Sequence, residues 1–166
     1  GLDGEGSDGL DGDGSDGQEY TFDSIAVSAG DDILLARSPD SLAVYFGLCN
    51  SEFEHILVAS SAIGQNGDDA IELYMGGSAV EVYGDVDVDG TGEVWEYLNS
   101  WAKRKKDTGP DGDGFVATNW TYGGFDALDD TLSNDSCSNP YPFPKEQVEG
   151  PGSVFNSKFS SQRYFS

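Results

Sequence analysis

The stretch that decides the fold is Ala70-Ile-Glu-Leu-Tyr-Met-Gly-Gly-Ser-Ala-Val-Glu-Val-Tyr83. Apolar and polar side chains alternate on both sides of Gly76-Gly77, which is the period of a β-strand. A Gly-Gly pair supplies the positive φ angles of a tight primed turn, so the sequence predicts a β-hairpin with strands Ala70–Met75 and Ser78–Tyr83. One face should be buried and the other should face water. The expected buried face holds Ile71, Leu73, Met75, Val80 and Val82, and the expected water face holds Glu72 and Glu81.

Further short strands are predicted on the N-terminal side of this hairpin. Segments rich in β-branched and aromatic residues and broken by Gly, Asp, Ser and Pro occur at 22–27, 33–37, 42–46 and 56–59. No stretch shows a long, capped helical period, and residues 95–102 are expected to form a short helical turn at most. Short strands at this spacing predict an all-β sandwich, with Trp120 and Tyr122 in its core.

The two ends of the chain differ from this central region. Residues 2–17 are two acidic octapeptides that differ only at Glu5 and Asp13. Such a segment buries no apolar surface and is expected to be a disordered linker, unless calcium or a neighbouring chain orders it. We therefore divide the chain into a linker or assembly segment (1–19), a β-sandwich (20–144) and a C-terminal tail (145–166). The apolar tail segment 153–165 could dock on its own domain or on another subunit.

The charge of the chain limits its partners. It has 31 acidic and 8 basic residues among 166, giving a net charge of -23. Such a charge repels nucleic-acid phosphates and anionic membranes. No apolar run reaches the roughly 20 residues that cross a bilayer, and no basic-then-apolar leader opens the chain, so we expect a mature or excised segment without a membrane span.

Several sequence motifs occur together in one order. They are Asn66–Leu73, Val80–Gly84, Val88–Gly92, Trp95–Tyr97, Ser100–Ala102, Gly109–Gly112, Asn119-Trp120, Asp126–Asp129 and Cys137–Pro144. In this order they resemble the lamin-tail-like domains of secreted bacterial and algal proteins. The resemblance covers roughly residues 20–144. It implies an immunoglobulin-like β-sandwich that serves in adhesion, scaffolding or targeting, without catalytic residues.

One departure from that family concerns the first strands. Members of the family usually begin with two further strands, and here the acidic octapeptides stand in their place. A sandwich without its edge strands exposes unpaired backbone and an apolar groove, which another segment must fill. The tail 153–165 or a strand from a neighbouring subunit would fill it; alternatively, the chain has only diverged at its start.

A calcium-binding loop is predicted after the hairpin. Asp85, Asp87, Asp89, Gly90 and Glu96 match the spacing D-x-D-x-D-G followed by five residues and Glu, in which the carboxylates converge on one Ca²⁺. However, a strand precedes this loop where an EF-hand has a helix. The alternative is an acidic, solvated hairpin loop.

Other features favour an extracellular setting. Asn119 and Asn134 begin N-glycosylation triplets that we expect at the surface. Cys49 and Cys137 are the only cysteines, and a disulfide between them would stabilise the fold by about 4 kcal/mol. The basic residues 103–106 are interpreted as a charged strand end that neutralises nearby carboxylates or discourages edge pairing, in preference to an anion-binding site, and His55 as structural.

No set of nucleophile, base and orienting residue stands out, so the sequence does not favour an enzyme. Our first hypothesis is a non-catalytic structural or interaction module of an extracellular assembly or filament, with self-association or another extracellular protein as partner. The alternative is an accessory domain of a larger secreted enzyme such as a nuclease.

Overall fold

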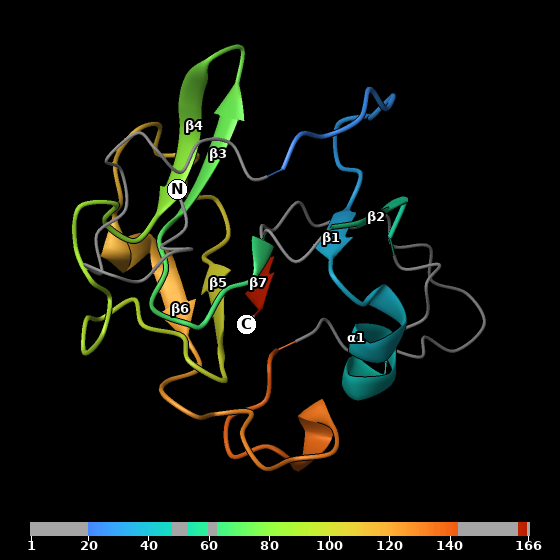
Figure 1. The fold of residues 1–166 in the computed structure, drawn as a ribbon, viewed down its shortest axis with the longest axis vertical. Helices are drawn as coiled ribbons and strands as arrows, with labels where there is room; N and C mark the ends of the chain where they lie inside the picture. Colours follow the sequence, from blue (N-terminus) through green and yellow to red (C-terminus); the bar gives the residue numbers. More distant parts are fainter. Residues whose placement is uncertain (1–19, 48–52, 60–62, 143–162, 166) are drawn as a thin grey trace.

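A computed structural model of the chain describes residues 20–47, 53–59, 63–142 and 163–165. The described part is rich in short β-strands and has one α-helix, which confirms the β-rich prediction. Figure 1 shows β1 (Ile33–Ala36), β2 (His55–Val58) and helix α1 (Pro39–Phe46) on one side of the molecule. Strands β1 and β2 pair in parallel, and they coincide with two of the predicted strands.

The other side holds two antiparallel sheets. Strands β3 (Ile71–Met75) and β4 (Ser78–Tyr83) form a hairpin. The second sheet has the order β6-β5-β7, so β5 is its central strand. Its members are β5 (Trp101–Arg104), β6 (Trp120–Tyr122) and β7 (Arg163–Phe165). Short 3₁₀ turns at Ala117–Asn119 and Asn134–Ser136 lie between β5 and β7 in the chain.

The hairpin forms where the sequence predicts it, but its faces differ from the prediction. Gly76 and Gly77 have φ angles of 62° and 85°, as a tight primed turn requires. A bulge between Leu73 and Tyr74 then shifts the register by one residue, so that Leu73 pairs with Glu81. A one-residue shift exchanges the faces of a strand. The prediction that Glu81 faces water is therefore wrong: its side chain is fully buried.

Residues 42–46 were expected to form a strand and instead belong to α1. Pro39 occupies the first turn, where its missing N–H costs nothing, and Asp40 follows it there. Gly47 ends the helix in the left-handed conformation with φ 65°, and its N–H donates to the carbonyls of Ala43 and Val44. These end signals outweigh the β-branched and aromatic composition of the segment. The strand expected at 22–27 is also wrong, because those residues form no regular element.

The core between the hairpin and the β6-β5-β7 sheet is aromatic. It consists of Tyr83, Trp95, Tyr97, Ala102 and Trp120, with Ile71, Phe115 and Tyr122 packed against it. The Tyr83 ring meets the rings of Tyr97 and Trp120 edge to face, with centroids 5.5 and 4.8 Å apart. The core positions predicted for Trp120 and Tyr122 are confirmed. Burial of Tyr122 raises the pKa of its phenol to about 12.

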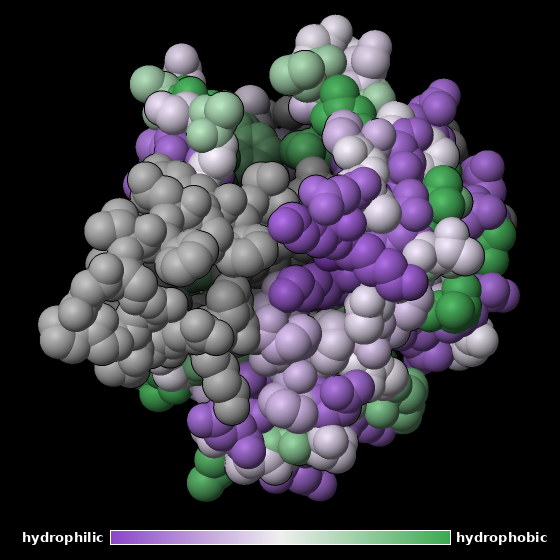
Figure 2. Space-filling view, turned by 180° about the vertical axis from the view of Figure 1, so that it is seen from behind, coloured by the Kyte–Doolittle hydropathy of each residue, from purple (hydrophilic) through white to green (hydrophobic). Residues whose placement is uncertain are grey.

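Tyr141 connects this core region to α1. Its ring meets Phe46 of α1 at 6.2 Å and Trp101 of β5 at 5.4 Å, edge to face in both cases. A hydrogen bond also joins the Tyr141 segment to β5: the Trp101 indole N–H donates to the carbonyl of Asn139 at 2.9 Å. Proline-rich residues 140–142 thus pack over the sheet without joining it. On the opposite face of the molecule, large hydrophilic areas surround separate hydrophobic spots (Figure 2).

Candidate functional site

A buried group of charged residues joins the hairpin to β5. Arg104 forms ion pairs with the fully buried Glu81 and with Asp111, the latter at 2.8 Å. The guanidinium carbon also lies 4.6 Å from the centre of the Trp120 ring. The amide of Asn119 donates to both oxygens of Asp111 at 3.0 Å. Arg104 therefore neutralises nearby carboxylates from a strand end, which confirms the interpretation of the basic run at this residue.

The pKa values of the two carboxyls of this group are shifted in opposite directions. Burial raises the pKa of Glu81, although Arg104 opposes the rise. Hydrogen bonding from Asn119, followed by the bond and the charge of Arg104, lowers the pKa of Asp111. This group joins β4 to β5 through one cation and two carboxyls.

Three of the predicted calcium ligands, Asp85, Asp89 and Glu96, accept hydrogen bonds from backbone N–H groups of the loop itself. Asp85 accepts a hydrogen bond from the N–H of Asp87 at 3.1 Å, and Asp89 accepts one from Thr91 at 2.9 Å. This bond lowers the pKa of Asp89. Glu96 accepts a hydrogen bond from a loop N–H at 2.8 Å. Among the described residues, no three His, Cys, Asp or Glu side chains are grouped closely enough to hold a metal ion, and calcium binding by this loop stays a prediction.

The asparagines of the two glycosylation triplets have structural partners. Asn119 is half-buried and binds Asp111, as described above. Asn134 is only 6% exposed: its side-chain N–H donates to the Tyr141 carbonyl at 3.1 Å, and its oxygen accepts from the Tyr141 N–H at 2.7 Å. The surface position predicted for Asn134 is therefore wrong. Attachment of a glycan at either asparagine stays a prediction.

Cys137 carries a free thiol, and Cys49 lies outside the described residues, so the disulfide between them stays a prediction. The sulfur of Cys137 lies 3.0 Å from the Tyr45 hydroxyl of α1 and 3.1 Å from the Thr131 hydroxyl. Burial, together with the bond to Cys137, raises the pKa of Tyr45. Cys49 follows Tyr45 by four residues, a distance of at most about 14 Å along the chain, which is compatible with a bridge to Cys137.

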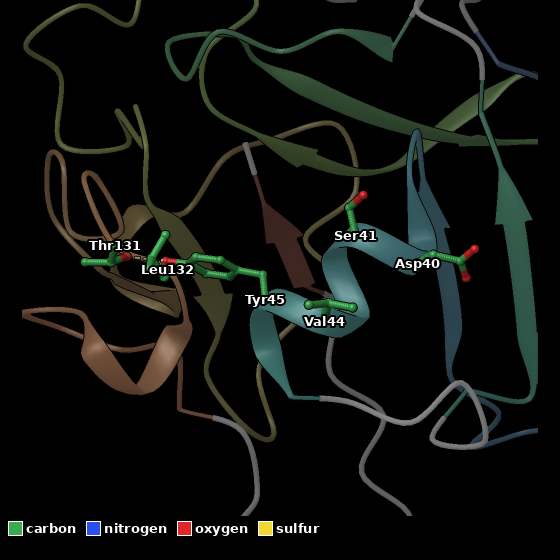
Figure 3. A pocket seen from close by; sticks show the side chains of 6 residues that line it. All are labelled: Asp40, Ser41, Val44, Tyr45, Thr131 and Leu132. Atoms are coloured by element: carbon green, nitrogen blue, oxygen red, sulfur yellow. Dashed lines mark hydrogen bonds between the residues drawn. The ribbon is translucent and has the colours of Figure 1, made fainter.

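An open depression lies beside Tyr45. It has a volume of about 490 Å³ and is lined by Asp40, Ser41, Val44, Tyr45, Thr131 and Leu132. Figure 3 shows the Tyr45 side chain reaching from α1 to Thr131 and closing one side. The Val44 and Leu132 side chains are 81% and 96% exposed. The lining of this depression is therefore mainly apolar and open to solvent, with Asp40 as the one charged side chain among the described lining residues.

A second depression, of about 340 Å³, lies below the hairpin. Its lining includes four carboxylates, those of Glu72, Asp85, Asp87 and Asp113, beside Val82 and Phe115 among others. These carboxylates give the hollow a negative potential, which favours solvated cations over anionic ligands.

The remaining candidate is the edge of β5 that carries β7. On the opposite edge, the N–H of Gly123 donates to the carbonyl of Trp101, and the N–H of Lys105 donates to Asn119. Backbone groups alternate between the two sides of a strand, so those of Ala102 and Arg104 point toward β7. β7 pairs there in antiparallel register, with Ala102 opposite Tyr164 and Lys103 opposite Arg163. The C-terminal tail thus completes the sheet around buried β5 residues.

Comparison with known protein families, curated proteins and solved structures finds no match for this chain. Its function must therefore be inferred from its own residues.

The sequence predicted β5 only in part: residues 95–102 were expected to form at most a helical turn, whereas residues 103–106 were interpreted as a strand end. Trp101-Ala-Lys-Arg104 has two apolar residues followed by two basic ones, so no alternation of apolar and polar residues marks it as a strand. Further, no described helix is long and apolar enough to cross a bilayer.

Proposed function

We propose that this chain is a non-catalytic structural module of an extracellular assembly, with a second copy or another extracellular protein as its partner. The observation that carries the proposal is the pairing of β7 with β5. A sheet that is completed by a terminal strand at the end of a long connection has the geometry used in β-strand addition between subunits.

We further propose that the fold is a reduced immunoglobulin-like sandwich related to lamin-tail-like domains. The hairpin and the β6-β5-β7 sheet enclose one aromatic core, as two packed sheets do. The parallel pair β1–β2 lies apart from this core (Figure 1). An experimental structure with the two sheets packed face to face would support this assignment, and a single continuous sheet would refute it.

Assembly can be tested directly on the purified chain. Light scattering after size-exclusion chromatography, over a range of protein concentrations and with or without Ca²⁺, should give masses above one chain. Electron microscopy should then show a defined particle or filament. A compact monomer under all these conditions would refute the proposal.

A further inference from the structure

β7 covers an edge that the fold cannot leave open. In β5, Trp101, Ala102 and Arg104 are buried, with exposed fractions of 2, 0 and 7%. The backbone groups of Ala102 and Arg104 point to the β7 side, and unpaired backbone groups at a buried position cost free energy. In the structure β7 pairs with this edge, and loss of β7 would leave these backbone groups without strand partners.

The connection that precedes β7 is long. Twenty residues, 143–162, connect the described end of the domain at Pro142 to Arg163. Pro142 already lies beside β5, because its carbonyl accepts a hydrogen bond from the Lys103 ammonium at 3.0 Å. A connection of this length spans at most about 70 Å when extended. That reach exceeds what closure on the same domain needs and is sufficient to reach a neighbouring copy.

Charge favours contact between the tail and another acidic body. Residues 153–166 contain Lys158 and Arg163 and no acidic residue, so all 31 acidic residues lie in 1–152. Opposite charges on two binding surfaces speed and direct their encounter. The tail is therefore attracted to an acidic body, either its own or that of another copy, whereas two bodies repel each other.

We propose that β7 exchanges between copies of this chain, so that Arg163–Phe165 of one copy pairs with β5 of a second copy. This inference rests on the proposed function and names its partner as the same chain. The exchanged and the closed forms make the same contacts, so little free energy separates them. Closure does not depend on protein concentration, whereas exchange increases with it.

Engineered cysteines can report which chain supplies β7. Lys103 and Arg163 face each other where the backbone bonds point away, so their Cα atoms are about 4.5 Å apart, a spacing that a disulfide can bridge. One chain carries Lys103→Cys and a differently tagged chain carries Arg163→Cys. After mixing and mild oxidation, the peptide joined through 103 and 163 is quantified by mass spectrometry. The wild type and each variant alone control for the native cysteines.

The expected result is a 103–163 bridge between the two tags whose yield rises as the concentration increases from about 10 µM to 1 mM. A chain with both substitutions should show the intrachain bridge replaced by the interchain one over the same range. Intrachain bridges alone at every concentration would overturn the exchange.

A proline variant tests the exchange without cysteines. Tyr164→Pro removes the N–H that pairs with Ala102, and it should reduce assembly about tenfold. Arg163→Pro is the matched control, because its N–H points away from β5 and proline is tolerated there. If wild type assembles but Tyr164→Pro assembles equally well and no interchain bridge forms, the exchange is wrong while the proposed function stands. If wild type never assembles, the proposed function itself fails.

Discussion

Replacement of Arg104 by methionine should destabilise the fold strongly and in a pH-dependent way. Met fills a similar volume but leaves the carboxylate of Glu81 buried without its cation, and the contact with Trp120 loses its charge. Breaking a buried ion pair by removing one partner costs about 3–5 kcal/mol. For a chain of this size, that lowers the melting temperature by about 6–20 °C. Lys105→Met, at an exposed neighbouring position, should change stability by less than about 0.5 kcal/mol.

The pH dependence follows from the raised pKa of Glu81. Because burial raises this pKa, the folded protein keeps the proton to a higher pH than the unfolded chain does. Stability from this group is therefore present in the protonated form and is lost as pH rises through the folded pKa. Without Arg104 the pKa rises further, so the loss caused by Arg104→Met should be larger at about pH 8 than at about pH 5.

Urea unfolding followed by far-ultraviolet circular dichroism measures this effect. Adding Glu81→Gln to Arg104→Met should recover part of the stability at the higher pH, because no buried charge then remains at position 81. The reasoning is refuted if Arg104→Met costs less than about 1 kcal/mol, or if its cost is the same at both pH values and adds to that of Glu81→Gln without coupling.

Three further predictions concern single residues. Gly90→Ala places a Cβ 2.4 Å from an indole ring and should cost about 1–3 kcal/mol in thermal unfolding, whereas Gly114→Ala, with open space around it, should be neutral. Asn134→Ala removes the side chain that bonds both backbone groups of Tyr141 and should cost about 2–4 kcal/mol by urea unfolding; an unchanged midpoint would contradict the buried pairing. If the loop rearranges to bind Ca²⁺, millimolar calcium should raise the melting temperature of wild type but not of Asp89→Asn, and equal shifts or none would refute this site.

The sequence predicted those elements whose cause is local. The Gly76-Gly77 turn fixed the hairpin, and aromatic character placed Trp120 in the core. The signals that begin and end α1 were also local, but composition was given more weight than Pro39 and Gly47.

Other features depend on contacts between distant residues. Glu81 is buried because a bulge shifts its register and because Arg104, 23 residues later, reaches it. Likewise, Asn134 is buried because its side chain forms hydrogen bonds with the backbone of Tyr141. Periodicity and triplet motifs contain no information on such pairings. The predictions for the candidate site residues therefore differ from the structure more than the predictions for the strands do.

The aromatic packing around Tyr83 gives the protein a built-in optical signal. Rings of Trp95 and Trp120 lie within 6.4 Å of the tyrosine, close enough for its excited state to pass its energy to tryptophan. The folded chain should therefore emit as a tryptophan protein even when tyrosine is excited, and the fixed rings should give a strong near-ultraviolet dichroism. Growth of a tyrosine emission band would report the separation of the hairpin from the β6-β5-β7 sheet without any added label.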